Sequence, residues 1–269
     1  YIPSKKGIKK ALKRGEIWVD NKEGKSGDWV KEGQYIELRD LELNPPKPYP
    51  LELEIIYEDE YFAVINKPAG ISVSGNQYRT IQNAIINQIK ISKCEDALKW
   101  PRPVHRLDNQ TSGLLVIAKT AKAIINLSKQ FENKDVKKTY YALVIGEPEK
   151  SGIINLPIDN HKATSLFKTL KTINSIKSNK ISLIELEPQT GRTHQLRIHC
   201  AKSGFPILGD KLYGDQNNTL LHKGLFLSAN KISLKHPILN DIKTFEINTP
   251  KKFEIRLKNE VKMYSKLVS

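Results

Sequence analysis

A charged, turn-rich loop that leads straight into a buried strand is the feature that most limits how this chain can fold. The segment reads His-Arg-Leu-Asp at residues 105–108, then Asn109 to Gly113, then the apolar run Leu114 to Ala118. Residues 109–113 are types that bond their own backbone or accept unusual dihedral angles, so we expect a turn. The apolar run is typical of a buried strand. A rigid strand would hold Asp108 on an accessible loop, which suits a reactive carboxylate.

The charge balance indicates the kind of partner. Across 269 residues, 44 Lys and Arg face 29 Asp and Glu, which gives a formal net charge of +15. This excess favours a polyanion, although it does not separate RNA from DNA or an anionic membrane. No apolar run approaches the about twenty residues that a membrane span needs, and no secretory signal is visible. Cys94 and Cys200 are too few for a disulfide framework, so we expect a reducing, cytoplasmic environment.

The first 14 residues carry six basic side chains and no acid. Ser4 can cap a helix that Gly15 closes, and strands are expected at 17–19 and 34–38 around a turn at 21–24. Four prolines between 45 and 50 predict an extended linker at residues 45–52. We therefore expect a small domain at 1–44 and a large one at 53–269.

In the large domain, apolar periodicity predicts strands at 53–57, 62–65, 140–145 and 181–187, and helices that begin at Thr80, Ala121 and near Thr193. Five lysines between residues 160 and 180 indicate either a solvated hairpin face or a phosphate contact. His194 and His199 are five residues apart, about 140° around a helix, which does not match the spacing of a zinc helix. With no other Cys or His cluster, we expect no metal site.

Three motifs carry a resemblance to a known family. The sequence HRLD followed by TSGLL resembles the signature of the RluA-type pseudouridine synthases. Lys138, Tyr140 and Ala142 match a K-x-Y-x-A pattern of that family, and GRTHQLRIH at 191–199 matches a third motif. The resemblance runs from about residue 55 to 250. It implies an α+β fold whose bent, mainly antiparallel sheet carries the site in a central cleft, with helices packed outside.

The resemblance also implies roles for single residues. Asp108 matches the family's nucleophile, and Arg106 matches the arginine that enters the RNA stack where the target uridine leaves. Tyr140 corresponds to the tyrosine against the flipped uracil, and Arg197 to the arginine that pairs with the nucleophile. A carboxylate in a closed pocket needs a cation to stay ionised, so that pairing is physically reasonable. His105 is placed with Arg106 as an RNA contact.

The N-terminal segment resembles an S4 RNA-binding domain, although that fold usually has an earlier helix that this sequence does not contain. The first residue is Tyr1 rather than Met, so we expect a preceding segment and treat the domain as partial. A basic surface helix without a ligand is the alternative. The expected RNA contacts are the basic residues of the first helix: Lys5, Lys6, Lys9, Lys10, Lys13 and Arg14.

The resulting prediction is a monomeric isomerase that converts uridine to pseudouridine in structured RNA. Ribosomal RNA is the favoured substrate and tRNA the alternative. The reaction neither gains nor loses atoms or electrons, so no cofactor is expected. Whether Asp108 attacks C1′, attacks C6 or begins at C2′ stays open. A base-removing glycosylase and a non-catalytic RNA-binding protein are the rival hypotheses.

Overall fold

The structure is a computed structural model, and it describes residues 4–38, 46–214 and 224–268. Contacts divide the chain into an N-terminal unit, Tyr1–Pro46, and a larger unit, Lys47–Ser269, which is named the catalytic unit for the catalytic residues expected in it. No helix in the described ranges is both long enough and apolar enough to cross a membrane.

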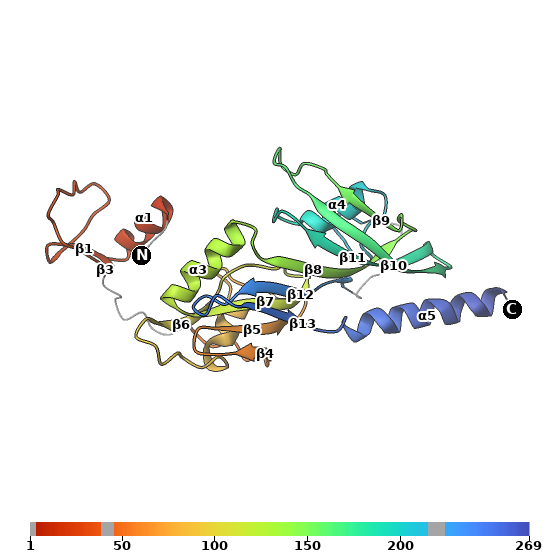
Figure 1. The fold of residues 1–269 in the computed structure, drawn as a ribbon, viewed down its shortest axis with the longest axis horizontal. Helices are drawn as coiled ribbons and strands as arrows, with labels where there is room; N and C mark the ends of the chain where they lie inside the picture. Colours follow the sequence, from red (N-terminus) through yellow and green to blue (C-terminus); the bar gives the residue numbers. More distant parts are fainter. Residues whose placement is uncertain (1–3, 39–45, 215–223, 269) are drawn as a thin grey trace. The chain divides into compact units, whose positions relative to one another are not determined.

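The N-terminal unit combines one basic helix with a small sheet (Figure 1). Ser4 accepts a hydrogen bond from the Gly7 amide and caps the helix, as its sequence predicts. The expected turn at 21–24 is different, because two of its residues pair with β1 as a short strand. The three strands form an antiparallel sheet in the order β2-β1-β3. The elements are α1 (Lys5–Lys13), β1 (Ile17–Val19), β2 (Lys22–Glu23) and β3 (Ile36–Leu38).

The catalytic unit is an α+β fold built on a ten-stranded sheet. The main strand order is β4-β5-β7-β12-β8-β11-β10-β9, with β6 paired to β7 and β13 paired to β12. Among the described strands, β7 and β12 form the one parallel pair. The strands are β4 (Glu54–Glu58), β5 (Phe62–Lys67), β6 (Ala97–Pro103), β7 (Ser112–Thr120), β8 (Lys137–Ile145), β9 (Ser151–Ile154), β10 (Ser165–Ser175), β11 (Asn179–Pro188), β12 (Leu227–Lys235) and β13 (Ile242–Glu246).

Helices cover the sheet at several places (Figure 1). Helix α3 packs on β7, α4 packs on β11, and α5 packs on β10. The helix predicted from Thr80 starts with Thr80 as its cap, but its second turn is a 3-10 helix. The helix predicted near Thr193 starts two residues later. The helices are α2 (Ile81–Ala84), η1 (Ile85–Asn87), α3 (Ala121–Glu132), α4 (Gln195–Lys202) and α5 (Lys251–Val268).

Strand β7 lies at the centre of the core and is buried on both faces. Leu115 and Ile117 pack in one hydrophobic cluster, whereas Leu114 and Val116 pack in the cluster beneath α3. This two-sided burial explains why the strand is a continuous apolar run rather than an alternating one. The start of β7 requires Gly113, because a Cβ at this position would lie 2.2 Å from the Ala229 carbonyl oxygen of β12. The glycine therefore lets the two halves of the sheet meet just beyond the 105–108 loop.

Part of the predicted linker belongs to the folded unit. The Tyr49 amide donates to the Asn83 carbonyl at 3.2 Å, and the Pro48 carbonyl accepts from the Tyr78 hydroxyl at 2.8 Å. Tyr49 and Leu51 also pack against the hydrophobic cluster that contains α2. Residues 48–52 therefore lie on the catalytic unit instead of forming a free spacer, because their apolar side chains find a core to pack on.

Candidate active site

The loop at 105–108 is anchored on both sides of Asp108. Leu107 is 5% exposed and packs in the core cluster. After Asp108, the Thr111 amide closes the turn on the Asp108 carbonyl at 3.1 Å. The Asn109 carbonyl accepts from the Gly70 amide at 2.8 Å, which ties the loop to the segment after β5. The Asp108 side chain itself stays 20% exposed, so a substrate can reach it.

Lys67 supports this loop from beneath, and its role was not predicted from the sequence. Its fully buried ammonium group donates to three carbonyl groups, those of Pro68 at 2.9 Å, Ile71 at 2.8 Å and Asn109 at 3.2 Å. Burial lowers the pKa of Lys67 to about 8, and the Asp108 carboxylate opposes that shift. Residues 67–70 thus support the Asp108 loop. The strand predicted at 62–65 ends before Lys67, so the apolar periodicity did not single out this lysine.

His105 is partly exposed at the pocket, and its role as an RNA contact stays a prediction. Its Nε2 accepts the Val116 amide at 3.1 Å, and its ring stacks on Phe131 with centroids 4.4 Å apart. Burial, assisted by the nearby Lys138 ammonium, lowers the pKa of His105 to about 3. The imidazole is therefore neutral at neutral pH. Its hydrogen bond fixes the start of the loop to β7.

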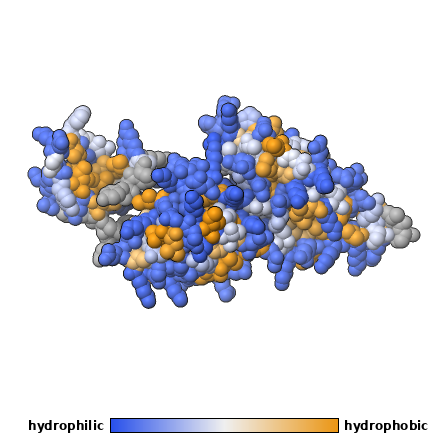
Figure 2. All heavy atoms as spheres, in the orientation of Figure 1, coloured by the Kyte–Doolittle hydropathy of each residue, from blue (hydrophilic) through white to orange (hydrophobic). Residues whose placement is uncertain are grey.

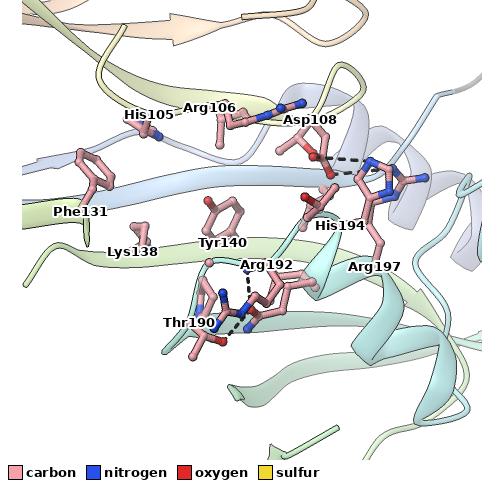
Figure 3. A pocket seen from close by; sticks show the side chains of 18 residues that line it. His105, Arg106, Asp108, Phe131, Lys138, Tyr140, Thr190, Arg192, His194 and Arg197 are labelled. Atoms are coloured by element: carbon pink, nitrogen blue, oxygen red, sulfur yellow. Dashed lines mark hydrogen bonds and ion pairs between the residues drawn. The ribbon is translucent and has the colours of Figure 1, made fainter. Parts of the chain in front are cut away.

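Asp108, Arg106 and Tyr140 line one pocket of about 340 Å³ (Figure 3). Arg106 is exposed at this pocket, whereas Tyr140 comes from β8 and is partly buried. Burial and the Asp108 carboxylate both raise the pKa of Tyr140, so its phenol stays protonated at neutral pH. Tyr141 lies on the other face of β8, where its hydroxyl donates to Glu185 at 3.2 Å. This is the separation that strand alternation predicts.

Arg197 reaches the pocket, but its principal partner differs from the one expected. Its Nε and Nη2 donate to the two carboxylate oxygens of Asp210 at 2.8 and 2.7 Å. Its Nη1 lies 3.8 Å from Oδ2 of Asp108. Burial alone would raise the pKa of Asp210, but Arg197 and two backbone amides hold it below its usual value. The motif predicted that Arg197 pairs with Asp108. In the structure the Arg197 guanidinium faces two carboxylates, those of Asp210 and Asp108.

His194 joins Asp108 from the other side (Figure 3). Its Nε2 lies 3.8 Å from Oδ1 of Asp108, and its Nδ1 is 2.9 Å from the Tyr213 hydroxyl. His194 occupies the N-cap of α4 with φ of 55°. Neither Asp210 nor Tyr213 was selected from the sequence. Both follow α4 at a distance that no helical or strand period describes.

The other polar residues of the GRTHQLRIH motif lie partly at the pocket and partly in the core. Gln195 lines the pocket and accepts from the Arg192 amide at 3.0 Å and the Thr190 hydroxyl at 2.7 Å. His199 is fully buried between the Ser165 hydroxyl and the Leu156 carbonyl. Gln195 therefore shapes the turn before α4, and only part of the motif faces Asp108. Among the residues that the structure describes, no three potential metal-ligating side chains are grouped together.

The predicted basic contacts of the N-terminal unit divide into two kinds. The Lys5, Lys9, Lys10 and Lys13 side chains are exposed on α1, while the side chain of Lys6 lies outside the described residues. Arg14 differs, because its guanidinium binds Glu16 in a bidentate pair with one contact at 2.6 Å. Arg14 is therefore engaged with an acid, and its role as an RNA contact stays a prediction.

Comparison with known proteins places this site in a family. The model of the RNA pseudouridylate synthase family matches residues 61–202, which hold Asp108, Tyr140 and Arg197. The chain belongs to the RluA-type pseudouridine synthases. It is 35% identical over 223 residues to the dual-specificity RNA pseudouridine synthase RluA of Haemophilus influenzae, covering 76% of this chain and 96% of that protein. It is 33% identical over 280 residues to ribosomal large subunit pseudouridine synthase C of Vibrio parahaemolyticus, covering 90% of this chain and 83% of that protein.

The fold agrees with this assignment. The solved structure of human RNA pseudouridylate synthase domain containing 4 aligns with a TM-score of 0.62 at 23% identity, over 78% of this chain and 93% of that one. This pseudouridine synthase is accordingly an isomerase that acts on RNA, and its catalytic unit has the family's α+β fold.

Proposed function

We propose that this enzyme isomerises specific uridines of ribosomal RNA, with Asp108 as its nucleophile. The observation that carries the proposal is the position of Asp108 at the pocket. It is partly exposed on a loop tied to β7 and to the segment after β5, and a cationic or donor group faces each of its carboxylate oxygens. No other carboxylate lines that pocket among the described residues.

The chemistry follows from what the reaction must do. The N1–C1′ bond breaks, the uracil turns, and C5 joins C1′; one proton leaves C5 and one is taken up at N1. Asp108 assists the loss of uracil from C1′, and covalent assistance of this kind divides one difficult step into two easier ones. The protonated Tyr140 hydroxyl is available to donate a hydrogen bond to the base or to assist the proton transfers of the reaction. The balance of atoms requires no added redox group or nucleotide.

Access to the uridine requires base flipping, because a base in a stem cannot reach a pocket of this kind. Extrusion costs a few kcal/mol. Arg106 is exposed beside Asp108, so it is placed to fill the space that the base leaves. Arg192 is exposed on the opposite wall of the same pocket and offers a second cation near the RNA backbone. The exposed lysines of α1 extend the basic surface in the N-terminal unit, which we interpret as a partial S4 domain.

The choice of RNA rests on relatives and charge. One relative is named for the ribosomal large subunit, and another is named as dual-specificity. The face of the molecule in Figure 2 is largely hydrophilic, in keeping with the net charge of +15. We therefore favour large-subunit ribosomal RNA over tRNA, and we treat the enzyme as a cytoplasmic monomer.

Pseudouridine mapping in cells tests the function directly. RNA from cells that carry the wild-type gene, no gene, or the Asp108→Asn form is compared site by site in ribosomal RNA and tRNA. We expect at least one ribosomal position to lose pseudouridine in both altered strains. If pseudouridine is lost only from tRNA, the substrate is tRNA and not ribosomal RNA. Unchanged maps in both RNAs would overturn the proposed function.

The two rival hypotheses have their own signatures. A glycosylase would release free uracil from the RNA, whereas an isomerase retains it. A non-catalytic RNA-binding protein would support every cellular function when Asp108 is replaced by Asn. Purified protein incubated with RNA from cells without the gene, followed by analysis of the free bases and of the RNA nucleosides, separates these outcomes.

A further inference from the structure

The nucleophile is faced by two groups at equal distance, one for each of its oxygens. His194 Nε2 lies 3.8 Å from Oδ1 of Asp108, and Arg197 Nη1 lies 3.8 Å from Oδ2 (Figure 3). Hydrogen bonds to nitrogen are usually about 2.7–3.2 Å long. Both groups therefore orient the carboxylate through charge and dipole without closing on it, which leaves its lone pairs available to the substrate.

One short segment holds both of these groups from behind. The Tyr213 hydroxyl is 2.9 Å from His194 Nδ1, while Asp210 binds Arg197 through two contacts. Asp210 Oδ1 also accepts the Leu212 and Tyr213 amides at 3.0 and 3.2 Å, so the segment is tied to itself. The Tyr213 ring lies 5.1 Å from the Arg197 guanidinium. A shift of this segment would move both neighbours of Asp108 together.

The backbone of His194 points to a role outside its helix. His194 occupies the N-cap of α4 in the left-handed region, with φ 55° and ψ 20°, and its side chain makes no capping hydrogen bond. This region is unfavourable for an L-residue with a side chain. A residue in a costly conformation that does not cap its helix is a candidate for a functional constraint. Here the conformation directs the imidazole between Asp108 and Tyr213.

The two contacts of the ring specify a tautomer. A carboxylate oxygen only accepts, so the nitrogen that faces Asp108 is best satisfied when it carries the proton. Nδ1 is then the acceptor, and the Tyr213 hydroxyl is the donor. Without that hydroxyl, nothing on the Tyr213 side favours a proton on Nε2 over one on Nδ1.

We propose that Tyr213 and His194 form a positioning pair, in which the Tyr213 hydroxyl fixes the orientation and tautomer of His194 so that Nε2–H orients the Asp108 carboxylate opposite Arg197. This rests on the proposed function of Asp108. Neither residue needs to touch the RNA. The pair affects the rate at which the bound uridine reacts and leaves the affinity for RNA unchanged.

Replacement of Tyr213 by Phe is the first test, because it removes only the hydroxyl and keeps the ring beside Arg197. The probe is large-subunit ribosomal RNA, tritiated at C5 of uridine and taken from cells without the gene, which releases its label on isomerisation. We expect the single-turnover rate to fall about 3- to 10-fold, as for removal of one hydrogen bond, with unchanged RNA affinity and thermal stability. Tyr141→Phe is the matched control, since it removes a hydrogen-bonded hydroxyl on the other face of β8.

Two variants of His194 separate its two contacts. In His194→Asn the amide sits near the former Nδ1 and still reaches Tyr213, but it is too short to reach Asp108, and Asn accepts the left-handed backbone well. In His194→Gln the amide extends toward the former Nε2. We expect Gln to retain clearly more of the single-turnover rate than Asn. In the Asn background, Tyr213→Phe should cause no further loss, because it acts through His194.

The nitrogen chemical shifts of His194, assigned by comparison with His194→Gln, give a measurement that does not depend on activity. In the neutral imidazole, we expect the proton on Nε2 in the wild type and a change toward Nδ1 in Tyr213→Phe. A wild-type rate in Tyr213→Phe, or a proton on Nδ1 in the wild type, overturns the proposal. An enzyme inactive on every RNA fraction overturns the proposed function instead, and the nitrogen shifts still decide the Tyr213 contact.

Discussion

Each unit of this chain contains a bidentate arginine–carboxylate pair, and the two differ mainly in burial. In the N-terminal unit Arg14 binds Glu16, with side-chain exposures of 50% and 9%. In the catalytic unit Arg197 grips Asp210, with exposures of 9% and 1%. The same fork geometry therefore meets water in one unit and protein in the other. Exposed pairs contribute about 0–1 kcal/mol, whereas breaking a buried pair leaves an uncompensated charge.

The surroundings of the two pairs explain this difference. Ala11 is the only fully buried hydrophobic side chain among the described residues of the N-terminal unit, and several of its apolar residues remain at the surface (Figure 2). The catalytic unit holds four hydrophobic clusters. A small core can display charge, which is sufficient to contact phosphates. Holding a nucleophile between two donors requires groups fixed by a large core.

The largest effect is expected from replacement of Asp108, the carboxylate that Arg197 faces. Asp108→Asn should abolish isomerisation, because an amide is a far poorer nucleophile of nearly the same size. RNA affinity should remain within a few-fold, since the shape and the nearby cations stay. Single-turnover assays with the tritiated RNA, together with binding measurements, check both parts. Substantial turnover by the variant would remove Asp108 from its role.

The second prediction breaks the two arginine pairs in turn. Arg197→Met should lower the free energy of unfolding by about 3–5 kcal/mol, because Asp210 is left buried without its cation. Arg14→Met, the matched control, should cost less, because half of the Arg14 side chain is exposed and water screens the pair. Chemical denaturation of both variants and the wild type measures the difference. Similar losses in the two variants would mean that burial does not distinguish the pairs.

Double variants identify the stabilising partner of Arg197. Adding Asp210→Asn to Arg197→Met should recover part of the lost stability, because the buried carboxylate is removed with its cation. Adding Asp108→Asn should recover less, since Asp108 lies 3.8 Å away and is partly exposed. The opposite order would make Asp108 the principal partner.

What the sequence predicted well depended on local patterns. The apolar run of β7, the cap at Ser4 and the helix that begins near residue 80 follow from periodicity and capping chemistry, and the structure contains them. The three motifs led to the correct family because they occur in the expected order. Each of these features is determined by residues only a few positions apart.

What it missed depended on contacts between distant segments. Asp210 and Tyr213 meet Arg197 and His194 across 13 and 19 positions, and no period links them. A histidine that binds the backbone, such as His105, and a basic RNA contact look alike in the sequence, because only the structure shows that a backbone amide occupies its ring nitrogen. The left-handed turn at His194 likewise depends on the packing around α4.

The third prediction sharpens the comparison between the units. Deleting residues 1–46 should weaken RNA binding and flatten its dependence on salt, by about 0.7–0.9 log units for each phosphate that the truncated protein no longer neutralises. Turnover at saturating RNA should change less, because Asp108, Tyr140 and Arg197 lie in the catalytic unit. Binding across a salt series with parallel single-turnover rates measures both. An unchanged salt slope in a folded truncation would mean that α1 is only a solvated surface.

The smallest expected effect is a loss of folding stability at acidic pH. It should arise in the catalytic unit, because residues 1–46 contain no histidine. The folded-state pKa of His105 is lowered from 6.5 to about 3. As the pH falls below 6.5, the unfolded chain binds a proton at this position and the folded protein does not, so the free energy of unfolding decreases. Above 6.5 the residue has no such effect.

His105→Gln keeps an acceptor for the Val116 amide but does not titrate. Between pH 7 and pH 5 the wild type should therefore lose about 1–2 kcal/mol more stability than the variant. Urea denaturation at the two pH values measures this, with His161→Gln, at an exposed position, as the matched control. An equal pH dependence in the wild type and His105→Gln would show that folding does not lower the pKa of the imidazole, which would strengthen the prediction that His105 contacts RNA.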